Sequence, residues 1–432
     1  MSCRRSSLTY VRRAIPRRPC GSHTPNFANV SLRQDTSSLL HRLGLHHTVR
    51  RKHKTPAPEH PMKITDIKPI LTDRYLLVRV YTDAGIIGNG ESGLWAHHRS
   101  VAVLIGELSD YFVGKDPLQI DHHYQTVSRS FHFMGAATNS ALSAIDIALW
   151  DILGKSVNLP VYQLLGGKCR DKVRVFNNVG GATNEARVAS ARQCVADGFT
   201  SLRTSPFFAD FEKRESSQVV TEAIDVIEAI RDAVGYDIDL GVEIHRNLQP
   251  DEAITLARAV EPYRLKYYED PLAPESNEAH AHIARHIDIP MALGERNFLL
   301  TQFKELIDSQ IAAFIRPDLS LTGGFTQMKK VAAIAEPAMV QLFPHLMGSP
   351  VNNAAFAHLA AAIPNYYVTE VNAHTDEQLS LVDRPFVTTN GYREIPDRPG
   401  IGVEIDEDAC ARLPFVGRSI GGFFHSDGSV AH

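Results

Sequence analysis

The chain has 432 residues, of which 44% are apolar and 22% are charged, and its formal net charge at pH 7 is −4. This composition is typical of a globular protein that is long enough for more than one domain. No apolar run reaches the roughly 18 residues needed to cross a bilayer, which excludes a membrane protein. The five cysteines are widely spaced, so we expect neither disulfides nor a zinc module, and a reducing, cytoplasmic location.

The first 61 residues differ in charge from the rest of the chain. They contain twelve Lys and Arg residues but only two acids, Asp35 and Glu59, and leave 33 basic and 47 acidic residues after them. We interpret residues 1–61 as a basic leader, either a mis-assigned or disordered start before Met62 or a mitochondrial targeting segment. A nucleic-acid-binding arm is the third alternative, and we expect no nucleic-acid partner.

Residues 62–170 are expected to form an α+β domain. Three strand-like runs are separated by turn residues, one of which is the hairpin signal DAG, and they lie at 62–70, 76–83 and 86–92. The periodicity then becomes helical, most clearly at 140–155, where apolar residues recur every three or four positions. The sequence therefore predicts a small antiparallel sheet followed by helices.

Residues 171–385 alternate short apolar strands with amphipathic helices. The eight expected strands lie at 173–178, 200–205, 239–244, 265–270, 290–295, 312–317, 339–344 and 366–370. We therefore predict an α/β fold whose catalytic domain is a modified (β/α)8 barrel of the TIM type. A doubly wound open sheet has the same local pattern, but no strand is followed by a glycine-rich dinucleotide-binding string. Residues 386–432 are expected to be a tail that returns to the first domain.

Three glutamates, Glu243, Glu269 and Glu295, follow one another at intervals of 26 residues. One strand, one helix and two loops of a parallel barrel occupy roughly 25 to 30 residues, so this spacing brings the three carboxylates to the same end of successive strands. Three acids at one barrel mouth repel one another unless a cation lies between them. A hard divalent ion suits carboxylate oxygens, so we expect one Mg²⁺ to bind here.

Two histidines lie beside these acids. His245 is two residues after Glu243, so strand alternation is expected to point both side chains to the same face, and an imidazole there is suited to acid or base work. His345 and Asp318 end adjacent strands, which suggests a dyad in which the carboxylate raises the basicity of the imidazole. The alternatives are a histidine that only packs beside the metal and a buried histidine satisfied by an acid.

Two more charged residues end predicted strands. Glu370 could contact the substrate, or donate a hydrogen bond to a developing oxyanion if its pKa is raised, or form a plain salt bridge. Arg203 stays charged at any working pH, so we expect it to bind a carboxylate group of the substrate and not to act as a base. Together these residues indicate an enzyme that removes a proton next to a carboxylate.

The chain resembles the enolase superfamily, specifically the mandelate racemase subgroup, over about residues 62–410. The resemblance rests on the strand meander, the strings IALWDILGK, LLGGK and PDLSLTGG, the glutamate ladder, and the PH that precedes a glycine-containing loop. It implies that residues 62–170 are a capping domain, that the ladder binds Mg²⁺, that Asp318 and His345 form the base dyad, and that Glu370 faces the substrate. It also implies a homo-oligomer, either a dimer or an octamer.

The E-x-H string at 243–245 resembles the galactonate and gluconate type of acid sugar dehydratase. The resemblance implies that His345 removes the C2 proton to give a Mg²⁺-stabilised enediolate. His245 then protonates the leaving 3-hydroxyl, giving a 2-keto-3-deoxy sugar acid. The resemblance also implies that loops of the capping domain set the substrate specificity, so Trp95 and His97 in these loops are candidate substrate-binding residues.

Strand 200–205 departs from the family pattern, because many relatives have a Lys-x-Lys pair where this chain has Arg203. A racemase that uses a lysine base at this position would lack that base in this chain. A dehydratase that uses two histidines would keep all its catalytic groups. We therefore expect a hydro-lyase that acts on a small sugar acid and has no membrane partner. The alternatives are an epimerase or cycloisomerase on the same scaffold and a non-catalytic regulatory or binding protein.

Overall fold

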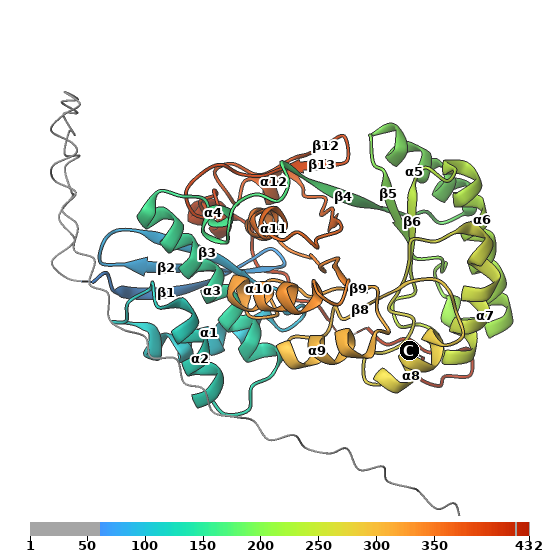
Figure 1. Ribbon diagram of the computed structural model, residues 1–432, viewed down its shortest axis with the longest axis horizontal. Helices are drawn as coiled ribbons and strands as arrows, with labels where there is room; N and C mark the ends of the chain where they lie inside the picture. The colour runs from blue at the N-terminus through green and yellow to red at the C-terminus, as the bar shows by residue number, and fades with distance from the viewer. Residues whose placement is uncertain (1–60, 420, 432) are drawn as a thin grey trace, which may run out of the picture. The chain divides into compact units, whose positions relative to one another are not determined.

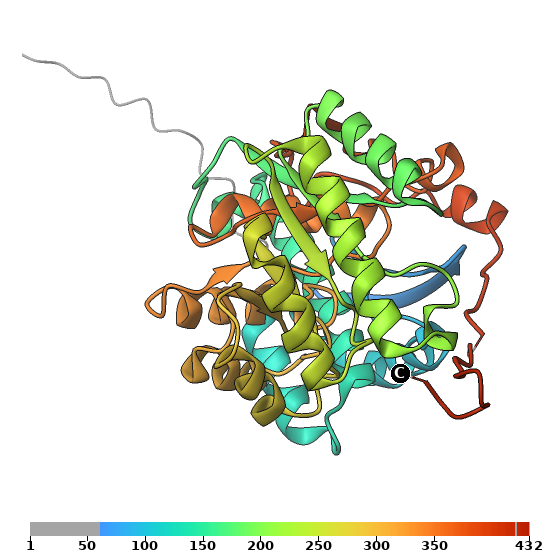
Figure 2. The ribbon, with the colours of Figure 1, turned by 90° about the vertical axis from the view of Figure 1, so that its right-hand side faces the viewer.

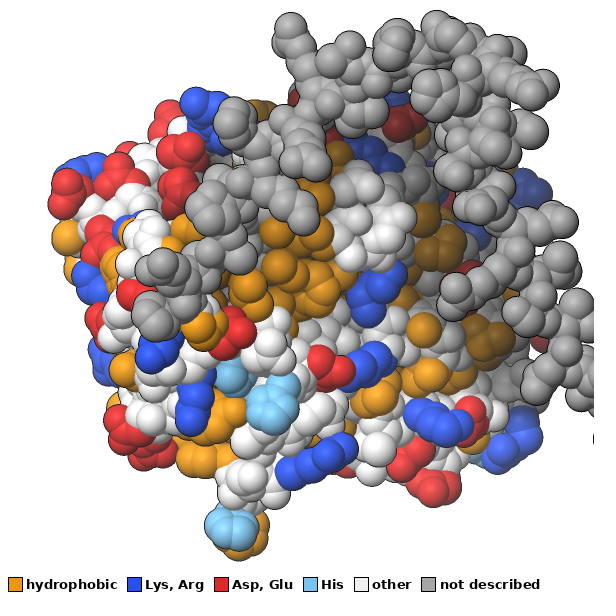
Figure 3. Space-filling model, turned by 60° about the vertical axis from the view of Figure 1, so that its left-hand side comes forward, with side chains coloured by type: hydrophobic (Ala, Val, Ile, Leu, Met, Phe, Trp, Pro, Cys, Tyr) orange, Lys and Arg blue, Asp and Glu red, His pale blue; other side chains and the backbone are white. Residues whose placement is uncertain are grey.

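The computed structural model describes residues 61–419 and 421–431 (Figure 1). The expectations for the basic leader therefore lie outside the described residues. No helix among the described residues is long and apolar enough to cross a membrane. Figure 3 presents one face of the molecule, on which acidic and basic side chains are interspersed.

The N-terminal section begins with an antiparallel three-stranded meander, as expected from the sequence. Its strands are β1 (Ile64–Thr72), β2 (Tyr75–Thr82) and β3 (Ile87–Ser92), in the order β1-β2-β3. Gly85, with a φ of 73°, forms the turn between β2 and β3, at the expected hairpin. The helices that follow are α1 (His98–Phe112), α2 (Ile120–Ser130), α3 (Ala136–Val157) and α4 (Val161–Leu164). Helix α3 packs against β3, and its apolar side chains share one core with those of β1, β2 and α1.

Eight parallel strands close into a barrel, which confirms the predicted fold class. They are β4 (Lys172–Val179), β5 (Ser201–Thr204), β6 (Asp239–Glu243), β7 (Tyr267–Glu269), β8 (Met291–Leu293), β9 (Phe314–Ile315), β10 (Gln341–Leu342) and β11 (Thr369–Glu370). Each of β4 to β9 pairs with the next strand, and β11 returns to pair with β4. A bridge between Leu342 and Tyr366 completes the ring.

Helices connect the strands on the outside of the barrel. They are α5 (Asn184–Ala196), α6 (Ser216–Val234), α7 (Pro250–Val260), α8 (Asn277–Ala284), α9 (Leu300–Ser309), α10 (Gly324–Ala335) and α11 (Pro350–Ala362), with short 3-10 turns η3 (Phe211–Lys213) and η4 (Glu261–Tyr263). Figure 2 shows α5, α6 and α7 along the outer surface. Helix α11 starts with Pro350 after the cap Ser349, whose Oγ accepts from the N–H of Val351 at 3.0 Å.

Aromatic side chains fill the barrel interior beneath the carboxyl ends of the strands. Phe176, Tyr267, Phe314 and Phe343 are buried together, and the ring centres of Tyr267 and Phe343 lie 4.7 Å apart. The interior of such a barrel is a packed core and not a pore. We call this cluster the aromatic floor, because the charged side chains described below lie directly on it.

The chain after β11 departs from a regular β/α repeat. The helix that follows is the four-residue α12 (Asp376–Leu379), and a hairpin of β12 (Thr388–Thr389) and β13 (Tyr392–Glu394) adds β13 antiparallel to β4. Helix α13 (Glu407–Arg412) then lies against β1, where Thr72 Oγ1 donates to the carbonyl of Cys410 at 3.1 Å. Helix α13 thus packs against the first strand of the chain.

Candidate active site

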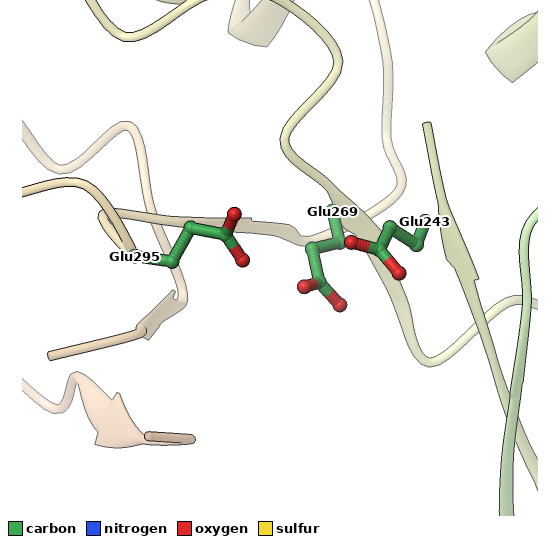
Figure 4. A group of neighbouring side chains, drawn as sticks. All are labelled: Glu243, Glu269 and Glu295. Carbon is green, nitrogen blue, oxygen red and sulfur yellow. The ribbon is translucent and has the colours of Figure 1, made fainter. Parts of the chain in front are cut away.

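The three ladder glutamates meet at the carboxyl ends of β6, β7 and β8. Glu243 and Glu269 are paired in the β6–β7 register, and Glu295 follows β8. One carboxylate oxygen from each lies within 4.8 Å of the other two. Figure 4 shows the carboxylate of Glu295 directed toward those of Glu243 and Glu269. The regular spacing in the sequence therefore corresponds to a compact cluster of oxygen atoms.

Buried arginines neutralise part of this charge from below. Nη1 of Arg203 donates to both oxygens of Glu269 at 2.9 and 3.1 Å, and its Nη2 lies 2.6 Å from Glu370 Oε1 and 3.2 Å from Glu243 Oε2. Nε of Arg316 lies 2.7 Å from Glu269 Oε1. The guanidinium groups of Arg203 and Arg316 sit 4.8 and 4.3 Å from aromatic rings of the floor.

A third arginine lies on the Glu295 side of the cluster. Nη1 of Arg246 donates to Asp270 Oδ2 at 3.0 Å and also to Glu295, while the backbone N–H of Arg246 donates to the carbonyl of Asp270 at 2.8 Å. Five carboxylates and three guanidinium groups are thus in contact, leaving two negative charges when all are ionised. The group comprises Glu243, Glu269, Asp270, Glu295 and Glu370 with Arg203, Arg246 and Arg316.

The acids of this cluster differ in pKa. Burial raises the pKa of Glu269 to about 8, although Arg203 and Arg316 oppose the rise. Burial also acts on Glu295, but the charges of His345 and Arg246 outweigh it and lower its pKa. An all-oxygen donor set that carries two excess negative charges when every group is ionised fits a hard divalent cation such as Mg²⁺, which would displace the proton of Glu269 on binding. Glu243, Glu269 and Glu295 would hold it.

His345 and Asp318 are in direct contact. Nδ1 of His345 donates to Asp318 Oδ2 at 2.8 Å, and Asp318 Oδ1 accepts from the N–H and Oγ of Ser320 at 2.8 and 2.6 Å. Burial lowers the pKa of His345, but the hydrogen bond to Asp318 and the charge of Glu295 overcome burial and raise it to about 9. The two residues, which follow β9 and β10, thus have the geometry of a base and its orienting carboxylate.

His245 reaches the site by a different route from the one that the sequence suggested. Strand β6 ends at Glu243, and both His245 and Arg246 adopt left-handed backbone conformations, with φ of 54° and 68°. Nη2 of Arg246 donates to His245 Nε2 at 2.6 Å, and burial together with the charge of Arg246 lowers the pKa of His245. A strained turn, and not strand alternation, therefore sets the direction of this imidazole.

Glu370 and Arg203 are placed differently from the expectation. The two side chains lie under the ladder and form an ion pair with each other. Arg203 also forms ion pairs with Glu243 and Glu269, so its partners are carboxylates of the protein and not the substrate carboxylate expected from the sequence. Burial raises the pKa of Glu370, but Arg203 and Arg316 outweigh burial and lower it. The raised pKa that Glu370 would need to donate a hydrogen bond is therefore absent, and the salt-bridge alternative describes its contacts.

A cavity of about 610 Å³ opens above the ladder. It brings together residues that are far apart in the sequence, namely Trp95 and His97 of the N-terminal section, His245, Glu295, Asp318 and His345 of the barrel, and Arg246, Arg296 and Arg418. The guanidinium group of Arg418 lies 5.4 Å from the ring centre of Trp95. The predicted residues Arg203, Glu243, Glu269 and Glu370 are not among those that line the cavity.

Four arginines of this site were not predicted from the sequence. Arg246 and Arg296 directly follow His245 and Glu295, so their position beside predicted site residues was a signal. Arg316 stands in the predicted strand 312–317, where a charged residue among apolar ones indicates a functional position. No sequence pattern around Arg418 indicates a functional residue, because the C-terminal segment reaches the cavity only in the folded chain.

Comparisons with known proteins agree with these observations. Residues 47–166 match the N-terminal domain of mandelate racemase and muconate lactonizing enzymes, and residues 186–409 match the enolase C-terminal domain-like family. D-galactonate dehydratase of Ralstonia pickettii (strain 12J) is 34% identical over 86% of this chain and 100% of its own length. That of Klebsiella pneumoniae (strain 342) is 35% identical over 82% and 94%.

Solved structures give the same result. An enolase from Pantoea ananatis, solved with D-gluconate and Mg, has a TM-score of 0.77 at 28% identity and covers 86% of this chain and 99% of its own. A Salmonella structure described as that of a putative dehydratase has a TM-score of 0.78 at 32% identity and covers 82% of this chain and 98% of its own. The resemblance inferred from the motifs is confirmed, and the expected hydro-lyase class agrees with the dehydratase names of the curated relatives. The chain belongs to the mandelate racemase and muconate lactonizing enzyme family, within the enolase-like proteins.

Proposed function

We propose that this protein is a Mg²⁺-dependent sugar-acid dehydratase that acts on an aldonic acid of the galactonate or gluconate type. The observation that carries the proposal is that a histidine–aspartate pair and a second histidine line one cavity beside a cluster of three acids that could hold a metal ion. The product would be a 2-keto-3-deoxy sugar acid.

His345 is the proposed base. Because its Nδ1 donates to Asp318, Nε2 is the nitrogen available to accept the C2 proton of the substrate. A bound divalent cation would supply a counter-charge for the substrate carboxylate and for the negative charge that develops when this proton leaves. The same counter-charge would offset Glu295, which otherwise helps to keep His345 protonated, so that the imidazole could act as a base near neutral pH.

His245 is the proposed acid for the leaving 3-hydroxyl. Arg246 donates to its Nε2, so the proton of the neutral imidazole lies on Nδ1. In the neutral form Nδ1–H is therefore the donor that can face the leaving oxygen. Loss of the 3-hydroxyl as water needs a full proton, so His245 would first take up a proton at Nε2, giving up the bond from Arg246, and the imidazolium would then transfer its Nδ1 proton to the leaving oxygen.

The relatives support the choice of substrate class. The matched curated proteins from Ralstonia and Klebsiella are named D-galactonate dehydratases, and the Pantoea enolase was solved with D-gluconate and Mg. The arginine at position 203 also supports dehydration over two-base racemisation, because a guanidinium group contacting three carboxylates cannot accept a proton.

A substrate screen tests the proposal. The purified protein is incubated with a panel of aldonic and aldaric acids and Mg²⁺, and 2-keto-3-deoxy products are measured. We expect product from at least one aldonic acid, none after chelation of the metal, and none from a His345→Asn control. Solvent deuterium at C2 without loss of water would instead indicate an epimerase, and absence of both products and exchange would refute the proposal.

A further inference from the structure

The sheet of the N-terminal section holds a buried carboxylate that has no ion-pair partner. Glu91 lies near the end of β3 with a relative exposure of 1%, and no Lys or Arg among the described residues pairs with it. Burial raises its pKa to about 7, although hydrogen bonds from residues 349 and 352 oppose the rise. Burying an unpaired acid is costly unless its hydrogen bonds are satisfied, so the contacts of Glu91 require an explanation.

Those contacts all lie at the start of helix α11 in the barrel. Glu91 Oε1 accepts from the N–H of Ser349 at 2.8 Å, and Oε2 accepts from Ser349 Oγ at 2.6 Å and from the N–H of Asn352 at 3.1 Å. Three donors thus converge on two oxygens. The partial positive charge of a helix N-terminus also favours an anion here. Glu91 therefore clamps the first turn of α11 to the N-terminal sheet.

The clamped turn lies directly after the segment that carries the proposed base. His345 precedes Ser349 by four residues, and the segment between them is held by two further hydrogen bonds. Trp95 Nε1 donates to the carbonyl of Met347 at 3.3 Å, and His374 Nε2 donates to that of Gly348 at 2.9 Å. The position of His345 along its loop is thus tied to β3 through Glu91.

A second path runs from the clamp to the partner of His345. Asn352, whose N–H is bound by Glu91, donates through Nδ2 to Ser320 Oγ at 3.0 Å. Ser320 Oγ in turn donates to Asp318 Oδ1 at 2.6 Å, which leaves Asp318 Oδ2 for His345. Both members of the dyad are therefore joined to Glu91 by continuous hydrogen bonds through buried side chains.

We propose that Glu91 is a positioning residue for the Asp318–His345 base. The expected effect on the reaction rate rests on the proposed function. The effect of Glu91 on the position of His345 does not. A carboxylate is required because all three groups that face it are donors. In Glu91→Gln the amide NH₂ must replace one oxygen and meet a donor, so the start of α11 shifts. A small displacement of a base from its proton lowers the rate much more than it lowers substrate affinity.

The test compares Glu91→Gln with Asp151→Asn. Asp151 is a suitable control because it is also fully buried in the N-terminal section and accepts from two backbone N–H groups, those of Asn89 and Ile401 at 2.9 and 2.8 Å. It does not contact the clamp. We expect Glu91→Gln to lower kcat roughly tenfold to a hundredfold with KM and Mg²⁺ affinity nearly unchanged. The kinetic isotope effect of C2-deuterated substrate should rise.

Asp151→Asn should lower thermal stability without these kinetic changes. If both variants lose stability and keep the wild-type kcat and isotope effect, Glu91 is only a structural residue and the inference is wrong. Should Glu91→Gln not fold, Asn352→Ala tests the same path, because it removes the bond to Ser320 and keeps the backbone N–H that Glu91 binds.

A readout that needs no substrate separates this inference from the proposed function. In protein labelled with ¹⁵N-histidine, the His345 imidazole signals are identified by their loss in His345→Asn. We expect them to move in Glu91→Gln and in Asn352→Ala, and to stay in place in Asp151→Asn. If the wild-type protein dehydrates no sugar acid but the His345 signals still move in Glu91→Gln and Asn352→Ala, the proposed function is refuted and the inference stands. Unchanged His345 signals in Glu91→Gln would overturn the inference.

Discussion

Replacing Arg203 by Met should destabilise the protein strongly when no divalent cation is bound. The guanidinium group is 7% exposed and contacts Glu243, Glu269 and Glu370 within 3.2 Å. Removing one partner of a buried ion pair costs about 3–5 kcal/mol, because the remaining charge is left uncompensated. Against a typical total of about 5–15 kcal/mol, such a loss is easily measured. A divalent cation should recover part of it, since the site would then carry three excess negative charges.

Urea unfolding followed by circular dichroism, with and without Mg²⁺, measures this effect. Arg296→Gln is the matched control, because Arg296 lines the cavity and forms no ion pair with an acid in residues 61–419 or 421–431. We expect the control to leave the free energy of unfolding nearly unchanged. If Arg203→Met instead raises KM and leaves the free energy of unfolding and its Mg²⁺ dependence as in the wild type, Arg203 is the substrate-binding residue that the sequence suggested.

Three further predictions concern protons. In His245→Asn, exchange of the C2 proton with solvent should persist while loss of water slows, and equal loss of both rates would contradict a separate acid. Mg²⁺ affinity measured by calorimetry should increase as the pH rises toward 8, because burial raises the pKa of Glu269 to about 8 and the cation must displace its proton. Burial lowers the pKa of His358 to about 4, so this residue contributes stability above pH 6.5 that is lost as the pH falls toward 4. Between pH 7 and pH 4 this effect should lower the free energy of unfolding of the wild type, measured with denaturant, by about 3 kcal/mol. His358→Gln should lack this part of the pH dependence.

The barrel and the clustering of the three acids could be predicted from the sequence because both follow from a repeat. A parallel strand returns to the same end of the barrel after each β/α unit, so equal spacing of Glu243, Glu269 and Glu295 is enough to bring them together. The contact of Asp318 with His345 has the same origin, since each residue follows one of two adjacent strands.

The remaining features depend on contacts that no local pattern encodes. The partners of Arg203 lie on strands β6, β7 and β11, so whether it binds substrate or protein carboxylates is decided across the barrel. The direction of His245 depends on a left-handed turn at a non-glycine residue, which strand periodicity cannot anticipate. Glu91 looks like an ordinary polar residue at a strand end until β3 meets the start of α11.

The aromatic floor has a consequence for the order of events at the site. Phe176 and Phe343 close the barrel beneath Arg203 and Arg316, so the ladder has no opening toward the other end of the barrel. Glu243 and Glu269 are not among the residues that line the cavity, whereas Glu295 is. A divalent cation would therefore reach the ladder from the side of the cavity, the side from which a substrate would also enter. A substrate bound in the cavity would then slow release of the cation until the product leaves.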